Sequence, residues 1–290
     1  MTGSMITGLG LPTQTRPVRT GGRTRQRRRV SPTLILAFLV LVMIALWAIV
    51  PSLFTPYDPL VGDSAEGLLA PSPAHPFGTD LLGRDIYARV VYGTRTTLTA
   101  TLFAVLVGGS VGAAIGLVSA YVGGRVDGAI MRFIDVFLAI PGLLLAMTVV
   151  TALGPGTINI AVAVAIGSVP AFARIMRSEV MRTKSRDYIE AARISGTGPV
   201  RTMTRHILPN AASPVLALAA LELGAAVIAV ASLGFLGYGA PPPQPEWGLS
   251  VVEGRDLLAT HPWIALLPGL VIALMVLSTN RVSNFIAEGS

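Results

Sequence analysis

One stretch of the sequence has the residue order of a serine-hydrolase nucleophile. Gly108-Gly109-Ser110-Val111-Gly112 matches Gly-x-Ser-x-Gly, a pattern that needs a strand-turn-helix context and a histidine base beside the serine. The stretch lies inside a long apolar segment, whereas the histidines of the chain lie outside such segments: His75, His206 and His261. We therefore interpret Gly108, Gly112 and Gly116, spaced by four residues, as a face on which two helices pack closely.

The sequence also lacks the residues that other catalytic centres require. It has no cysteine, which excludes disulfides, thiolate nucleophiles and cysteine metal ligands. The zinc-binding pattern His-Glu-x-x-His is absent, and we expect no metal site. The one lysine, Lys184, follows Thr183, whereas a nucleotide-binding P-loop needs Gly-Lys-Ser/Thr. We therefore expect no catalytic residue and no cofactor on this chain.

The composition indicates that most of the chain lies in lipid. The 290 residues are 52% hydrophobic and 13% charged, and the mean hydropathy is +0.67. A soluble domain carries about 25% charged residues. About half that fraction is too little to cover a water-facing surface of this size.

Six segments are apolar and long enough to cross a bilayer, whose core needs about 20 helical residues. They are Thr33–Val50, Leu98–Tyr121, Phe133–Leu153, Ile158–Phe172, Val215–Leu236 and Ile264–Ser278. We predict an all-α polytopic membrane protein with six transmembrane helices. Its expected parts are a basic disordered cytoplasmic tail (1–32), the first transmembrane helix (33–53), an extracytoplasmic segment (54–93) and a five-helix core (94–286).

The basic residues predict how the chain is oriented. Seven arginines precede Pro32, and eight basic residues lie between the fourth and fifth segments, but only Arg255 lies between the fifth and sixth. Because positively charged loops stay in the cytoplasm, we expect both termini and the long loop after the fourth segment there. We expect the basic tail to contact membrane lipid, and we expect no nucleic-acid partner.

Two carboxylates inside the predicted spans are candidates for function, because charges are costly in lipid. Asp135 lies near the start of the third span, where we expect it to pair with Arg132 at the cytoplasmic interface. Glu222 lies in the fifth span and has no partner evident in the sequence. A pore-lining group, a contact between subunits and a neutral protonated acid all remain open for Glu222.

Two acidic–basic pairs precede the second span. Asp80 and Arg84, and likewise Asp85 and Arg89, are four residues apart, the spacing of neighbours on one face of a helix. We favour a solvated amphipathic helix that leads into the second span. The alternative is a docking surface for an extracytoplasmic partner.

The long cytoplasmic loop begins with a predicted helix. Asp187 can cap a helix whose third residue is Glu190, a variant of the capping box. Tyr188 and the pair Ala191-Ala192 lie on this helix, and the alanines leave a low face that a groove on another protein can approach. The spacing alone is equally compatible with an ordinary amphipathic surface helix.

A second short helix is expected after the first one breaks at Gly196. It would run through Thr202 and His206 and end at Pro209, because proline lacks the donor that a helix interior needs. Ser213-Pro214 would then cap and begin the fifth span.

Residues Arg186–Asn210 strongly resemble the EAA loop of ABC importer permeases, with Glu190-Ala191-Ala192, Gly196 and Leu208-Pro209 where that motif places them. The segment His75–Arg89 resembles the extracytoplasmic signature of the dipeptide/oligopeptide/nickel branch. So does Leu233–Gly239, which is followed by Pro245-Glu246-Trp247-Gly248. The likeness is greatest to the C-type permease of dipeptide systems. The chain departs from the pattern in the fifth span, where Val230 replaces a glutamate and Gly234 a serine.

The resemblance implies a type I ABC importer permease in a bacterial cytoplasmic membrane, with the EAA loop at 184–210. Its cargo would be peptides, dipeptides first, with nickel or another small ligand as the alternative. The implied partners are a second homologous permease, cytoplasmic ATPase subunits that bind ATP and Mg, and an extracytoplasmic substrate-binding (lipo)protein. An ion-gradient-driven secondary transporter is a rival from another class. Such proteins tend to show internal repeats, and no clear repeat is evident in this sequence.

The resemblance also implies roles for individual residues. Coupling to an ATPase subunit would rest on Asp187, Tyr188, Glu190, Ala191, Ala192, Gly196, His206 and Pro209. Docking of the binding protein would involve Asp80, Arg84, Asp85, Arg89 and Trp247.

Overall fold

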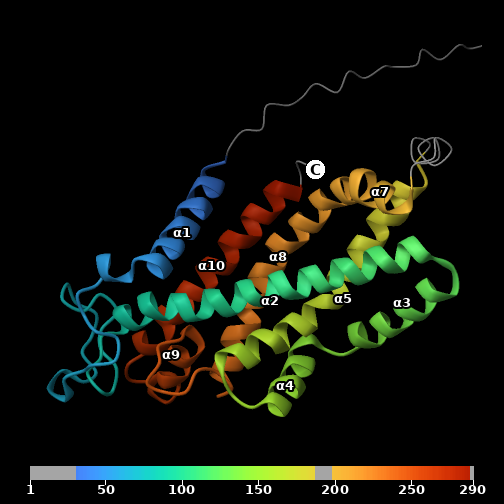
Figure 1. The fold of residues 1–290 in the computed structure, drawn as a ribbon. Helices are drawn as coiled ribbons and strands as arrows, with labels where there is room; N and C mark the ends of the chain where they lie inside the picture. Colours follow the sequence, from blue (N-terminus) through green and yellow to red (C-terminus); the bar gives the residue numbers. More distant parts are fainter. Residues whose placement is uncertain (1–30, 187–197, 288–290) are drawn as a thin grey trace, which may run out of the picture. The chain divides into compact units, whose positions relative to one another are not determined.

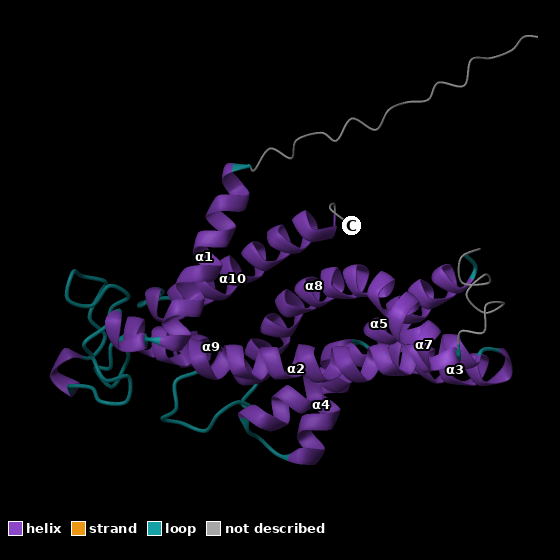
Figure 2. Cartoon of the chain, turned by 45° about the horizontal axis from the view of Figure 1, so that its top comes forward, coloured by secondary structure: helices purple, strands orange, loops and turns teal. Residues whose placement is uncertain are grey.

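The computed structural model describes residues 31–186 and 198–287, and nearly all of the regular structure in these ranges is helical (Figures 1 and 2). The longer helices are α1 (Pro32–Ile49), α2 (Ile86–Val122), α3 (Gly124–Ala139), α4 (Gly142–Leu153), α5 (Thr157–Lys184), α8 (Leu208–Phe235) and α10 (Trp263–Ala287). Shorter helical pieces are η1 (Pro51–Leu53), η2 (Ser64–Glu66), α7 (Pro199–Thr202), η3 (Met203–Ile207), α9 (Trp247–Glu253) and η4 (Arg255–Leu257).

Five of the helices are long and apolar enough to cross a membrane: α1, α2, α5, α8 and α10. The pair α3 and α4, bent by 93° at the break between them, passes the same test together and adds a sixth crossing if it is counted as one span. The prediction of one continuous helix over Phe133–Leu153 is therefore wrong. The break lies at Ile140-Pro141, because the proline ring pushes the preceding residue to an extended conformation, and Ile140 has ψ 129°.

Two of the crossing helices are longer than their apolar cores. α2 begins at Ile86, well before the predicted start at Leu98, because the Asp85 carboxylate accepts a hydrogen bond from the Ala88 N–H at 2.6 Å and caps the first turn. In this early part the Thr94 hydroxyl is satisfied within the helix, where it donates to the Val90 carbonyl at 2.8 Å. α5 likewise continues beyond Phe172 through a basic stretch to Lys184.

The closest helix pair is α2 and α5, and the glycines of α2 form the contact. Gly108 faces Ala165 and Ser168, Gly112 faces Val169 and Phe172, and Gly116 faces Ala173. A Cβ at Gly112 would lie 2.7 Å from the Phe172 Cβ and 3.1 Å from the Ala173 nitrogen, so only glycine allows this approach. The packing interpretation is confirmed. We call this contact the glycine seam.

Two apolar clusters join this pair to α1, α4, α8, α9 and α10. One joins α2, α4, α5 and α8 around buried residues such as Val150 and Phe172. The other joins α1, α2, α8, α9 and α10 around Trp247, Ile264 and Val271. α1 lies beside α10 (Figure 1), and Arg281 of α10 donates hydrogen bonds to the Ser31 hydroxyl at 2.8 Å and the Thr33 hydroxyl at 3.3 Å. The two described ends of the chain therefore meet.

The helical run that leads into α8 passes through both of its prolines. We expected Pro209 to end the second loop helix and Ser213-Pro214 to begin the fifth span, and both expectations are wrong. Pro209 lies in the first turn of α8, and Pro214 lies inside that helix. The π-type turn of η3 shifts the hydrogen-bond register just before Pro209. Proline has no backbone N–H, so no donor is left without a partner at this position.

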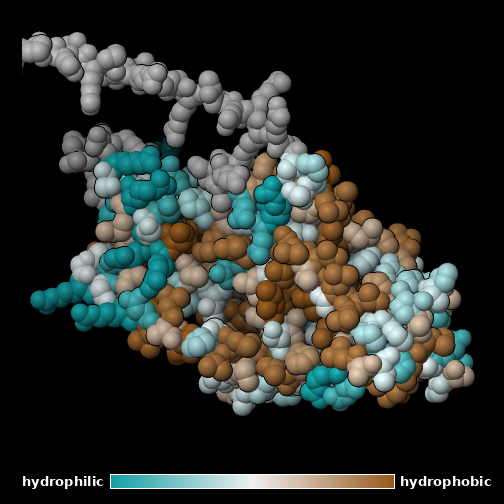
Figure 3. Space-filling view, turned by 180° about the vertical axis from the view of Figure 1, so that it is seen from behind, coloured by the Kyte–Doolittle hydropathy of each residue, from teal (hydrophilic) through white to brown (hydrophobic). Residues whose placement is uncertain are grey.

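Large apolar side chains are exposed along the crossing helices. On α1 they include Ile35, Leu36, Phe38 and Leu39, each more than half exposed. Figure 3 shows a broad hydrophobic area on one face, with hydrophilic residues toward its edges. This distribution suits helices that are solvated by lipid.

The glycine seam gives a first testable prediction. Replacing Gly112 with leucine should lower the thermal midpoint of the detergent-solubilised protein or prevent its folding, because the new side chain meets the α5 backbone. Overpacking of this kind costs about 1–3 kcal/mol or more. The matched control is Gly167→Leu on α5, where an added Cβ meets nothing within 4 Å. Equal midpoints for the two variants would show that the seam is not tightly packed.

Candidate functional site

The predicted coupling residues fall partly outside the described structure. Six of them lie in 187–197, which is not described: Asp187, Tyr188, Glu190, Ala191, Ala192 and Gly196. The remaining two follow that segment, His206 in η3 and an exposed Pro209 in the first turn of α8. The structure therefore shows how the two ends of the segment are held. We refer to residues 187–197 as the coupling segment, and its coupling role stays a prediction here.

The entry to the coupling segment is fixed to α2 by Lys184. Its ammonium donates hydrogen bonds to the Ala120 carbonyl at 3.0 Å and the Tyr121 carbonyl at 3.1 Å, and it lies 5.4 Å from the centre of the Tyr121 ring. Carbonyls in the last turn of a helix have no partner within that helix, and a cation there also suits the helix dipole. The one lysine therefore ties the end of α5 to the end of α2. This role was missed in the sequence, where the partner carbonyls cannot be read.

The exit from the coupling segment is held by apolar packing on the same two helices. Ile207 of η3 and Ala211 of α8 are fully buried. They form one cluster with Ala120 of α2 and with Met176 and Val180 of α5. Both ends of the coupling segment thus rest on the joined ends of α2 and α5.

The two carboxylates inside the predicted spans have different surroundings. Asp135 pairs with Arg174 of α5, at 2.6 Å between Oδ1 and the guanidinium, and both side chains are about 60% exposed. The expected pairing with Arg132 is therefore wrong, because α5 brings its own cation beside α3. Glu222 on α8 is half-buried and makes no hydrogen bond or ion pair with any described residue. Whether either carboxylate lines a pore remains a prediction.

The acidic–basic pairs before α2 do not form a solvated helix, and that expectation is wrong. Residues 80–85 form a tight loop in which Asp80 accepts from the Arg84 Nε at 2.6 Å and from the Leu82 N–H at 2.9 Å. Asp85 caps α2 and bonds the His75 Nδ1 at 2.9 Å instead of pairing with Arg89. Asp80, Arg84 and Asp85 are all less than 10% exposed.

Arg89 finds its carboxylate partner far along the chain. Its guanidinium donates to both oxygens of Glu253, at 3.0 Å each, and to the Pro59 carbonyl at 3.1 Å. Arg84 reaches the same Glu253 at 3.2 Å. Two acids and two arginines balance the charge of this group, as buried ions require. We call Asp80, Arg84, Arg89 and Glu253 the outer ion cluster. Glu253 was missed because no short spacing connects it to the other three residues.

Trp247 is buried in the same region. Its indole N–H donates to the Val90 carbonyl of α2 at 3.0 Å. The preceding Glu246 caps α9 by accepting from the N–H groups of Gly248 and Leu249, both at 2.9 Å. Burial raises the pKa of the Glu246 carboxyl, and these hydrogen bonds oppose the rise. The carboxylate lies against Gly234, where an added Cβ would come 3.1 Å from its Cδ. Glycine at position 234 leaves room for this cap.

The five predicted docking residues are thus all buried. The contacts of these residues attach the segment before α2 to α2 and to α9. Their side chains present little surface for a binding protein to contact in this conformation. Their docking role remains an untested prediction, and the contacts described here assign them a structural role.

The outer ion cluster gives a second prediction. Glu253→Gln should lower the free energy of unfolding by about 3–5 kcal/mol, because it leaves two arginines without their shared charge. The control is Asp256→Asn, which breaks an exposed pair with Arg255 worth about 0–1 kcal/mol. Thermal unfolding of the two purified variants in detergent compares them. Equal midpoints would contradict a structural role for the cluster.

Comparison with known proteins agrees with this architecture. The family model described as "binding-protein-dependent transport system inner membrane component" matches residues 112–289, more than half of the chain. Solved structures give the same fold: an amino acid ABC transporter aligns with a TM-score of 0.55 at 18% identity, covering 70% of this chain and 94% of that chain. The MetNI methionine ABC transporter aligns with a TM-score of 0.55 at 18% identity, covering 68% of this chain and 96% of that chain.

Curated relatives match along most of their length. A glutathione transport system permease protein of Pectobacterium atrosepticum is 42% identical over 259 residues, which is 89% of this chain and 85% of the relative. A dipeptide transport system permease protein of Haemophilus influenzae is 38% identical over 256 residues, which is 86% of this chain and 87% of the relative. The chain therefore belongs to the inner membrane component family of binding-protein-dependent transport systems and is a multi-pass protein of the inner membrane.

Proposed function

We propose that this chain is one permease subunit of an ATP-driven importer of short peptides. The observation that carries the proposal is the identity of 42% and 38%, over most of both chains, to permease proteins named for glutathione and dipeptide transport. Both named cargoes are short peptides, and we take dipeptides as the first candidate. Family membership favours ATP over an ion gradient as the energy source.

The energy would come from other chains. The sequence has no P-loop, so ATP and Mg would bind on separate cytoplasmic ATPase subunits. A second, homologous permease would complete the pathway, and an extracytoplasmic binding protein would deliver the peptide. We place both termini and the coupling segment in the cytoplasm. The arginine distribution supports this, and so do the contacts of Arg281 with Ser31 and Thr33, which bring the two ends of the membrane part together.

The mechanism follows from how the coupling segment is held. An ATPase subunit that binds residues 187–197 would displace the end of α5 and the start of α8 together. Lys184 connects the end of α5 to α2 at the entry, and Ile207 and Ala211 pack on both helices at the exit. Because the glycine seam joins α2 and α5 over about two turns, a displacement of the coupling segment would move both helices rather than bend one.

The test is to damage the coupling segment and measure coupling. In the reconstituted complex, Ala191→Arg or Gly196→Leu should lower both peptide uptake and peptide-stimulated ATP hydrolysis, because the face that enters the ATPase groove becomes bulky. Ala259→Arg, at an exposed alanine of the outer loop, controls for the added charge. The chain purified alone should release no phosphate.

Two results would count against the proposed function. Unchanged coupling in both segment variants, with the complex intact by size-exclusion chromatography, would remove the role of residues 187–197. A complex with its binding protein whose ATP hydrolysis responds to neither a dipeptide nor glutathione would contradict the peptide cargo.

A further inference from the structure

Helix α3 is joined to the rest of the chain mainly through charged groups near its two ends. The strongest contact is at its first turns, where Asp127 meets Arg177 of α5 in a two-point pair. The Arg177 Nε lies 2.7 Å from Asp127 Oδ1, and a terminal guanidinium nitrogen lies 2.6 Å from Oδ2. Such bidentate pairs fix the orientation as well as the distance of the two groups.

The same carboxylate also contacts α2. The Ser119 hydroxyl donates to Asp127 Oδ1 at 2.7 Å, and both residues are buried, with Asp127 8% exposed. The Asp127 side chain of α3 is therefore hydrogen-bonded both to the last turns of α2 and to α5. We call Ser119, Asp127 and Arg177 the inner clamp.

A second ion pair joins α3 and α5 farther along. Asp135, eight residues after Asp127, pairs with Arg174 of α5 at 2.6 Å. Arg174 and Arg177 are three residues apart and thus lie on one face of α5. Two carboxylates of α3 therefore each meet an arginine of α5, and the buried pair at Asp127 is the stronger of the two because the Asp135 pair is exposed.

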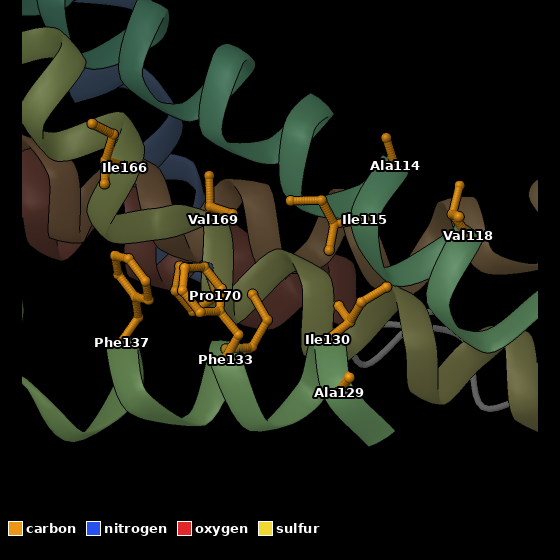
Figure 4. A pocket seen from close by; sticks show the side chains of 11 residues that line it. Ala114, Ile115, Val118, Ala129, Ile130, Phe133, Phe137, Ile166, Val169 and Pro170 are labelled. Carbon is orange, nitrogen blue, oxygen red and sulfur yellow. The ribbon is translucent and has the colours of Figure 1, made fainter. Parts of the chain in front are cut away.

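Between these charged contacts the apolar sides of the helices leave space. A groove of about 770 Å³ lies between α3, α2 and α5. Figure 4 shows Phe133 and Phe137 of α3 pointing across it toward Val169 and Pro170 of α5. Interdigitated packing normally holds one helix on another. On α3 the buried residues are Asp127 and Ile134, so little of the helix interdigitates with its neighbours and the Asp127 pair supplies a large part of its specific attachment to α5.

The position of the clamp relates it to the coupling segment. Arg177 lies seven residues, about two helical turns, before the end of α5 at Lys184. Lys184 in turn bonds the carbonyls next to Ser119 on α2. A displacement that enters at the end of α5 therefore reaches the clamp before it reaches any other part of α3.

We propose that Asp127 and Arg177 are positioning residues that pass movement of the coupling segment from α5 to α3. This inference rests on the proposed function. α3 follows α5 as long as the pair holds, and Ser119 keeps α2 in the same unit. The bend at Ile140-Pro141 separates α3 from α4, whose Ala146 and Val150 are packed in the core and do not need the pair.

The experiment uses the complete complex in proteoliposomes. Asp127→Asn and Arg177→Gln should each lower the peptide transported per ATP hydrolysed by about fivefold or more, the lower end of the usual coupling between sites. ATP hydrolysis should continue. The reversed pair, Asp127→Arg with Arg177→Asp, should restore the ratio, since Ser119 can also accept from an arginine. Glu179→Gln is the matched control, because Glu179 pairs with Arg182 within α5 and links no helices.

A second readout does not depend on the cargo. The chain has no cysteine, so spin labels at Gly128→Cys on α3 and Met181→Cys on α5 report one distance. The distribution of that distance should be narrow with and without ATP, and it should broaden when Asp127→Asn is added. A narrow distribution in the Asp127→Asn background, or parallel losses of transport and ATP hydrolysis in the single variants, would overturn the inference. A parent complex that moves no peptide would instead contradict the proposed function, and the spin-label distances would still decide the role of the clamp.

Discussion

The absence of side chains at three positions of α2 lets its backbone lie against that of α5, and the rest of the fold is arranged around this contact. Lipid is as apolar as the side chains, so moving an apolar side chain from lipid into a helix contact gains little free energy. Membrane helices therefore associate through close packing and polar contacts. Gly108, Gly112 and Gly116 provide the close packing over about two turns of α2. The other membrane helices pack around the paired helices, and the ends of the coupling segment are held where the pair ends.

Charged contacts lie near the start of α2 and near the ends of α2 and α5. At the outer end, the outer ion cluster binds the segment before α2 and the helix α9 to α2. At the other end, the inner clamp and Lys184 bind α2, α3 and α5 together. Between them the contacts are glycine, alanine and aromatic packing. This division follows from the cost of unpaired charge in lipid: ion pairs give directional attachment only near the ends, where water can contribute to their solvation.

Much of the fold follows from the sequence, because hydropathy and length alone indicate six crossings. The break in the third crossing had a visible signal in Pro141, but the continuous apolar run outweighed it. At Pro209 the expectation that proline ends a helix was wrong. The π-type turn just before Pro209 changes the hydrogen-bond register, so the missing N–H of proline does not interrupt the helix. Spacing of four residues found the Asp80–Arg84 pair. It could not find Glu253 for Arg89, 164 residues away, or Arg177 for Asp127, because those pairs exist only once the helices pack. Family resemblance, not geometry, identified the coupling segment.

The central claim is that α2 and α5 move as one unit when the transporter changes conformation. Reversible cross-linking tests it most directly, because this chain has no native cysteine. Tyr121→Cys and Lys184→Cys place thiols where the Lys184 ammonium now meets the Tyr121 carbonyl at 3.1 Å. Peptide uptake by the reconstituted complex is then measured with the two helices joined by a short reducible linker and again after reduction. The account predicts that uptake with the linker in place is at least as high as uptake after reduction, because the linker replaces the attachment that Lys184 provides. Uptake that is lost on cross-linking and regained on reduction would contradict it.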